Sequence, residues 1–244
     1  MKLDIRAIKF RLSGRSAMFK KPDVNSYAYF TYNNIHKVAL LGLLGAIIGL
    51  KGYTHQTSDY PEFYEKLSSL KVAIVPDLEK KGIFSKKIQN FNNSVGYASS
   101  EQGGNLIVRE QWLEDPQWDI YILEDSSEDY NKIKRNLQEG KTEYIPYLGK
   151  NDHPAVIDDV AEVRLHREDT NFIDSLVVTD KIVLGNKTKK TREVSYIFKE
   201  VVPTGMNKDF NFYEYKQSCL TNLDYIGLVD GFVYSHENYN LFFF

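Results

Sequence analysis

The feature that most constrains the fold is the apolar run VALLGLLGAIIGL at residues 38–50. It is about five residues too short to cross a bilayer and has the length of a buried helix. Because it is apolar nearly all round, it predicts a helix packed deeply against a sheet. Asn33 or Asn34 is expected to cap its first turn. No other segment is a better membrane candidate, so we expect a soluble protein with no membrane partner.

Three glycines, Gly42, Gly45 and Gly49, lie at roughly helical spacing on one side of this run. No Gly-Lys-Ser/Thr follows them, and they do not form a strand-to-helix turn, so neither a Walker A loop nor a dinucleotide fingerprint is indicated. A glycine inside a helix costs about 1 kcal/mol against alanine. We therefore expect a structural role, in which the helix backbone closely approaches a neighbouring element.

The remaining pattern predicts an α+β chain. Alternating residues at 3–12 predict the first strand, and a loop over residues 13–33 leads to the helix. Next come a helix at 58–70, a strand at 71–76, a polar excursion at 77–104, a hairpin of 105–113 with 118–123, a helix at 126–140 and a strand at 161–167. This order is the βαββαβ pattern of a ferredoxin-like domain, with extra length after its second strand.

The rest of the chain is expected to be β-rich. Residues 175–185 and 192–202 are interpreted as a hairpin, and 210–217 and 227–234 as further strands. The predicted division is thus a ferredoxin-like domain over residues 1–168 and a smaller β-rich domain over 169–244. The apolar end YNLFFF is expected to pack internally or against a partner, because exposing it to water is unfavourable.

Composition limits the chemistry. A single cysteine, Cys219, excludes a disulfide framework within one chain and fits a reducing, cytoplasmic setting. The five histidines are scattered without metal-ligand spacing, so no metal or other cofactor is predicted. The formal net charge of −2 argues against a simple nucleic-acid binder. Basic residues nevertheless concentrate near the start of the chain and in the 77–104 excursion, which allows a local basic face.

The loop before the apolar helix combines basic and aromatic residues, namely Arg15, Lys20, Lys21 and Lys37 with Phe19, Tyr27, Tyr29 and Tyr32. Basic side chains hold phosphates, and aromatic rings stack on splayed bases, so the combination suits single-stranded RNA. The alternative is that these aromatic residues pack on the core.

A second candidate is the loop PYLGKNDHP at residues 146–154. His153, Lys150 and Tyr147 suggest a metal-free RNA-cleaving set, in which histidine moves a proton and lysine stabilises phosphate charge. The same residues would equally grip a phosphate without cleaving it, and His153 would equally serve as a hydrogen-bonded loop residue.

Taken in order, these segments resemble a known family. The helix with Gly42, Gly45, Ala46 and Gly49, and the later YLGKN at residues 147–151, are similar to the Cas-five family of CRISPR-associated RAMP proteins, in particular its type I-B form. The resemblance extends to about Arg167. It implies an RRM-like, ferredoxin-like fold with a β-hairpin thumb, here at about residues 78–104.

The resemblance also implies a function. Family members are subunits of the Cascade surveillance complex in antiviral defence. They bind the 5′ handle of the crRNA and cap the backbone filament beside the large subunit, where the PAM of target DNA is read. The type I-C form cleaves pre-crRNA, so a metal-independent endoribonuclease is the alternative to a non-catalytic subunit, and a protein-only scaffold is a second alternative. The RNA-binding candidates are Arg15, Phe19, Lys20, Lys21, Tyr27, Tyr29, His36, Lys37, Lys86, Lys87, Arg109, Lys150, Asn151 and His153.

Overall fold

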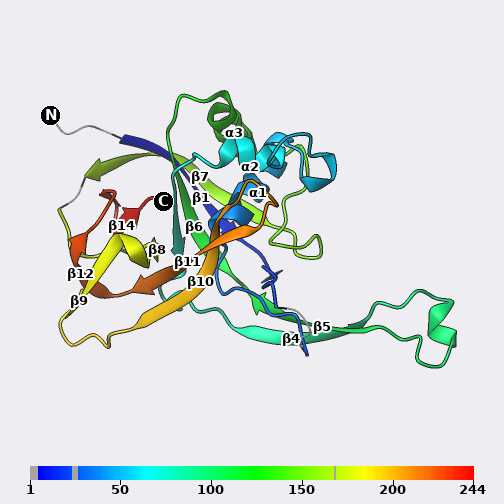
Figure 1. Ribbon diagram of the computed structural model, residues 1–244. Helices are drawn as coiled ribbons and strands as arrows, with labels where there is room; N and C mark the ends of the chain where they lie inside the picture. Colours follow the sequence, from blue (N-terminus) through cyan, green and yellow to red (C-terminus); the bar gives the residue numbers. More distant parts are fainter. Residues whose placement is uncertain (1–4, 24–26, 168) are drawn as a thin grey trace.

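The structure is a computed structural model that describes residues 5–23, 27–167 and 169–244 (Figure 1). It is strand-rich with few helices. Its largest layer is a six-stranded sheet in the order β14-β13-β7-β1-β6-β3, with antiparallel neighbours. Its strands are β1 (Ile5–Ser13), β3 (Val72–Pro76), β6 (Gln117–Leu123), β7 (Val156–Arg167), β13 (Val233–His236) and β14 (Tyr239–Phe242). The predicted strands at 71–76, 118–123 and 161–167 are therefore present, and the last begins earlier than predicted. The strand predicted at 3–12 is present from Ile5 onward, and its residues 3 and 4 lie outside the described residues.

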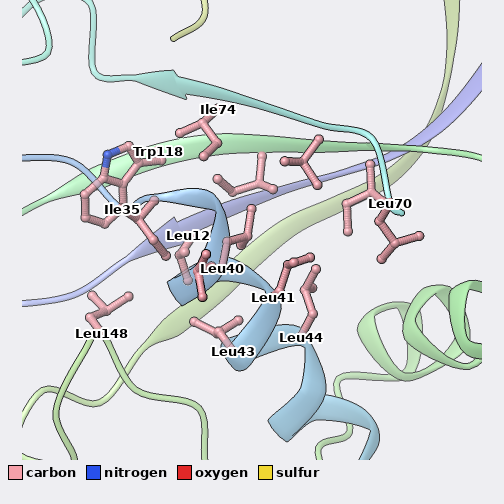
Figure 2. Packing of buried hydrophobic residues seen from close by; sticks show 14 of the residues in the cluster. Leu12, Ile35, Leu40, Leu41, Leu43, Leu44, Leu70, Ile74, Trp118 and Leu148 are labelled. Atoms are coloured by element: carbon pink, nitrogen blue, oxygen red, sulfur yellow. The ribbon is translucent and has the colours of Figure 1, made fainter. Parts of the chain in front are cut away.

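Three α-helices gather on one side of this sheet in Figure 1: α1 (Lys37–Ile48), α2 (Glu62–Leu67) and α3 (Glu128–Glu139). Alternation along β1 turns Ile8, Phe10 and Leu12 toward α1, and all three are buried with it in one cluster. Figure 2 shows Leu40, Leu41 and other α1 side chains among residues of this cluster. The apolar run is thus a buried helix, as predicted. None of the described helices is long and apolar enough to span a membrane.

The glycines of α1 allow close packing with α2. A methyl group added at Gly45 would lie 2.7 Å from Cβ of Phe63 on α2, whereas one at Gly42 would meet nothing nearer than 3.8 Å. Gly49 lies outside the helix that was expected to contain it. It follows α1 as the C-cap, with φ of 82° in the left-handed region that glycine tolerates best.

The helix begins differently from the prediction. Its N-cap is His36, whose Nδ1 accepts a hydrogen bond of 3.2 Å from the amide of Ala39, so the assignment of the cap to Asn33 or Asn34 was wrong. Both asparagines are buried and donate through Nδ2 to the carbonyl of Gly82, and Asn34 also accepts from Trp118. The two asparagines therefore bind the chain at Gly82, near the start of the 77–104 excursion, and do not cap the helix.

That excursion opens into a protruding hairpin, which we call the thumb and define as residues 86–114 (Figure 1). It pairs β4 (Lys86–Asn92) with β5 (Ile107–Glu114), and β2 (Ser16–Ala17) adds to β5 near its base. The predicted hairpin of 105–113 with 118–123 is wrong, because β5 and β6 enter different sheets across a turn at Asp115, where φ is 44°. The thumb therefore both begins and ends later than the predicted range of 78–104.

The last third of the chain forms two small sheets from β8 (Val177–Val178), β9 (Ile182–Thr188), β10 (Ile197–Met206), β11 (Tyr213–Thr221) and β12 (Leu223–Leu228). β10 pairs with β11, and β9 pairs with β12. The predicted hairpin of 175–185 with 192–202 is therefore wrong. Asn207 favours the observed pairing, because its Oδ1 accepts from the amides of Phe210 and Phe212 in the turn between β10 and β11.

The chain then returns to the large sheet. β13 pairs with β7, and Phe244 exchanges main-chain hydrogen bonds with Val72, the first residue of β3. Leu241, Phe242 and Phe243 are buried, so the apolar end packs internally. The predicted domain boundary stays a prediction, and Glu168, at which it was drawn, lies outside the described residues.

Candidate nucleic-acid interface

Three segments that are distant in the sequence meet at the base of the thumb. The amide of Tyr29 donates to the carbonyl of Arg109 at 2.9 Å, and the amide of Gln111 donates to the carbonyl of Tyr29 at 2.8 Å. The amide of Met18 donates to the carbonyl of Leu148 at 3.1 Å. These bonds bring the basic-aromatic segment (residues 15–32), the thumb strand β5 and the 146–154 loop together. We call this junction the thumb base.

Three exposed side chains of the thumb base and the partly buried Arg109 form two cation–aromatic pairs. The Lys20 ammonium lies 3.8 Å from the ring centroid of Tyr29, and the Arg109 guanidinium lies 4.3 Å from that of Tyr27. Tyr27 is 77% exposed. Positive charge beside accessible rings is the arrangement that holds a backbone phosphate and stacks a base. These four predicted residues are therefore brought together on one surface.

Beneath this surface lies a carboxylate that the sequence analysis missed. Glu110 is buried, and its carboxylate accepts from Lys150 at 2.7 Å and from Trp112 Nε1 at 2.9 Å. Because both carboxylate oxygens are occupied, Glu110 fixes the position of Lys150. The available signal was the position of Glu110 two residues before Trp112, which places both side chains on the same face of the strand.

His153 is 1% exposed and lies behind Trp112, with the two ring centroids 4.6 Å apart. Its Nδ1 shares a hydrogen bond of 2.7 Å with Ser16 Oγ, and its Nε2 has no hydrogen-bond partner in the described part of the chain. Burial lowers the pKa of His153, which favours the neutral imidazole. This residue holds the 146–154 loop against β2, while Tyr147 on the same loop is half-exposed.

Four predicted RNA-binding residues lie in the interior, namely His153, described above, and three others. Phe19 is 3% exposed and packs edge-to-face on Trp118. His36 is buried as the cap of α1, and burial lowers its pKa to about 3. Lys37 is also buried, and its ammonium donates to the main-chain oxygen of Phe244. Their assignment to RNA contact is corrected, because none presents its functional atoms at the surface that carries Tyr27 and Tyr29.

The other predicted residues are accessible. Arg15, Lys86, Lys87 and Asn151 are exposed. Lys21 is partly buried and pairs with Glu200 at 2.8 Å, and Lys87 lies 3.4 Å from Glu114. The Lys87–Glu114 pair is exposed, and such pairs contribute at most about 1 kcal/mol, so Lys87 loses little when it exchanges the carboxylate for a phosphate. The Lys21 pair differs, because the carboxylate of Glu200 is only 11% exposed. Among the described residues, no group of three histidine, cysteine, aspartate or glutamate side chains is positioned to hold a metal ion.

Comparisons with known proteins agree with this architecture. A family model described as "CRISPR-associated protein (Cas_Cas5)" matches residues 7–213. A chain of a structure titled "CRISPR RNA-guided surveillance complex" is 14% identical, with a TM-score of 0.52 over 92% of this chain and 93% of that chain. A CRISPR protein from Archaeoglobus fulgidus is 11% identical, with a TM-score of 0.51 over 97% and 98% of the two chains. No curated protein matches. Since the family model spans most of the sequence, the chain belongs to the Cas5 family of CRISPR-associated proteins.

Proposed function

We propose that this protein is a non-catalytic subunit of a CRISPR Cascade surveillance complex and that its thumb base binds the 5′ handle of the crRNA. The observation that carries the proposal is the surface on which Lys20 pairs with Tyr29 and Arg109 with Tyr27. Its mixture of charge and exposed rings suits single-stranded RNA, whose unstacked bases are open to stacking. Membership of the Cas5 family and the surveillance-complex title of one matched structure support the same role.

The proposal includes the finer fold assignment. We interpret β1, α1, β3, β6, α3 and β7 as a ferredoxin-like βαββαβ domain. The spatial order β7-β1-β6-β3, with every adjacent pair antiparallel, supports this interpretation. Within it, the thumb is the insertion between the second and third strands.

We further propose a position in the complex. The subunit belongs to a cytoplasmic type I-B assembly, in which it caps the backbone filament and lies beside the large subunit. In this position it contacts target DNA near the PAM only indirectly, through the large subunit. The thumb carries exposed apolar residues, including Tyr97 at 81%, Leu106 at 55% and Val95 at 53%. Apolar residues so exposed at the tip of a protruding hairpin favour a protein partner, for which we propose the adjacent backbone subunit.

The geometry of the 146–154 loop favours a non-catalytic role. A general base must reach the proton that it removes, but the imidazole of His153 is buried between Ser16 and Trp112. Lys150 is bound by the carboxylate of Glu110, which reduces its power to stabilise phosphate charge. Tyr147 is exposed on the same loop, but the histidine predicted to act with it is buried. We propose that these residues organise the RNA site.

The test uses the assembled complex. Replacing Lys20 and Arg109 together by alanine is expected to weaken retention of the crRNA handle at least tenfold. The salt dependence of binding should fall by about 1.4 in log–log slope, which corresponds to two lost phosphate contacts on a single strand. Lys187→Ala with Lys190→Ala removes the same charge from the exposed end of β9 and the turn that follows it, and should change neither value. Unchanged handle retention in the Lys20/Arg109 variant would refute the assignment, and assembly without any crRNA would favour a protein-only scaffold.

Catalysis is tested separately. The purified protein is incubated with labelled CRISPR repeat RNA in the absence of metal, and we expect the RNA to stay intact. Site-specific cleavage that His153→Ala abolishes would overturn the non-catalytic role and establish the endoribonuclease alternative.

A further inference from the structure

The basic-aromatic segment folds back on itself beside the thumb. Residues 19–21 and 30–32, which we call its two arms, run antiparallel and are joined by main-chain hydrogen bonds of 2.8 and 2.9 Å. Lys20 lies on the first arm, and Tyr27 and Tyr29 lie between the arms along the chain. The position of these three side chains therefore depends on what holds the arms in place.

A carboxylate from a distant strand contacts both arms. Glu200 lies on β10, and its Oε1 is 2.8 Å from the ammonium of Lys21, the last residue of the first arm. Its Oε2 accepts a hydrogen bond of 2.9 Å from the amide of Asn33, directly after the second arm. Hydrogen bonds to an ionised group are stronger than neutral ones. One largely buried side chain thus uses both of its oxygens to fasten the two ends of the segment to β10.

The thumb also lies within reach of this carboxylate. Lys86 is the first residue of β4. Burial lowers the pKa of Lys86, the negative charge of Glu200 raises it, and the positive charge of Lys21 lowers it further. The two lysines would repel each other across this corner if no carboxylate stood beside them. Glu200 therefore acts on the segment and on the thumb, which carry different parts of the proposed handle site.

Two possible roles of Glu200 predict opposite effects on RNA binding. A carboxylate that is only a surface charge repels phosphate, so its removal should strengthen binding. A carboxylate that holds the arms favours binding, because it fixes the segment before RNA arrives. Without it, part of the binding free energy is spent on ordering the segment. The direction of the change therefore distinguishes the two roles.

We propose that Glu200 is a positioning residue of the handle site, where it holds the two arms so that Lys20 and Tyr29 face the RNA. This inference rests on the proposed function, since it concerns the same site. It gives the last third of the chain a part in RNA binding, although none of the three segments of the thumb base comes from there.

Asp174 offers a matched control. Its side chain is also 11% exposed, lies 2.8 Å from the ammonium of Lys189 and accepts a hydrogen bond of 2.8 Å from the amide of Asn240. None of these residues belongs to the thumb base. Asp174→Ala therefore removes the same kinds of contact elsewhere and reports what a loss of stability alone does to RNA binding.

The test measures retention of the crRNA handle in the assembled complex. Glu200→Ala is expected to weaken retention by about fivefold or more, because the arms lose their common acceptor. Glu200→Gln keeps an acceptor oxygen at the same place and should lose no more than about twofold. Asp174→Ala should leave retention unchanged. In the Lys20→Ala/Arg109→Ala background, Glu200→Ala should have little further effect, since residues that act as a unit are not additive.

The outcomes separate this inference from the function on which it rests. Unchanged retention in the Lys20→Ala/Arg109→Ala variant refutes the handle site itself. If that variant loses RNA but Glu200→Ala retains it as well as or better than the wild type, the handle site stands and the positioning role is wrong. Equal losses in Glu200→Ala and Asp174→Ala would also overturn the positioning role, because stability alone would then explain the effect.

Discussion

The Lys150 ammonium lies 2.7 Å from the carboxylate of Glu110, and this ion pair fastens the 146–154 loop to the thumb strand β5. The carboxylate side chain is 6% exposed, whereas the lysine is 31% exposed. The pair therefore has one buried and one partly solvated member. The carboxylate of Glu110 would repel RNA if it were alone, but the Lys150 ammonium neutralises it.

We predict that Glu110→Ala lowers the free energy of unfolding by about 2–4 kcal/mol, because it leaves Lys150 and Trp112 Nε1 without their acceptor. Glu110→Gln should cost less, since the amide oxygen still accepts one hydrogen bond. Urea denaturation of both variants measures the difference. Two variants as stable as the wild type would show that the buried carboxylate contributes nothing to the thumb base.

The two helix glycines give a matched pair of substitutions. Gly45→Ala should destabilise the protein by about 1–3 kcal/mol, because its methyl group would lie 2.7 Å from Cβ of Phe63. Gly42→Ala meets nothing nearer than 3.8 Å and should be neutral or stabilising by up to about 1 kcal/mol through helix propensity. Thermal unfolding of the two variants tests this, and equal effects would contradict close α1–α2 packing at Gly45.

His36 should make the protein acid-sensitive. Its pKa is lowered to about 3 in the folded protein from an ordinary value of 6.5, so the unfolded chain binds the extra proton between these values. Stability present above pH 6.5 is therefore lost as the pH falls, by about 2–3 kcal/mol at pH 4.5. His36→Asn keeps an N-cap acceptor but cannot titrate. Its unfolding free energy, measured between pH 7 and 4.5, should fall less steeply than that of the wild type, and parallel curves would rule out this contribution.

Lys37 should make the stability of the protein depend on pH in the alkaline range. Because its pKa is lowered to about 8 from 10.5, the unfolded state binds more protons between these values, and stability rises with pH in that window. Relative to Lys37→Met, the wild type should gain about 2 kcal/mol between pH 7.5 and 9.5. Denaturant titrations at both pH values measure this gain. A constant difference between the two proteins would mean that Lys37 titrates normally.

Local signals in the sequence predicted several elements well. The apolar run predicted α1, and the segment 126–140 predicted α3, whose caps are Ser127 and Gly140. Strand pairing was harder to predict. Alternation of residues predicts that β5 and β10 are strands, but it does not say which strands they pair with. Because β6 follows β5 closely in the sequence, a β5–β6 hairpin was predicted. The observed partners of β5 are β4 and β2.

In the candidate site, too, local sequence signals were informative but contacts between distant segments could not be predicted. Basic and aromatic composition located Lys20, Tyr27 and Tyr29 on the exposed surface, yet it could not separate them from Phe19, which shares their chemistry but faces Trp118. Which aromatic residues of an irregular segment face inward depends on contacts with distant elements. Glu110 was missed for a related reason, because its importance comes from Lys150, forty positions later in the chain.

The return of the last strands to the large sheet has a kinetic consequence. β13 must pair with β7, and Phe244 with Val72, although long stretches of the chain separate these partners. Closing such large loops before the contacts form is entropically unfavourable, and topologies rich in distant contacts fold slowly. Until that closure, the edge of β7 and the apolar side chains that later cover β3 stay open to other chains. A newly synthesised copy should therefore be most prone to aggregation in the interval before its final strands close the sheet.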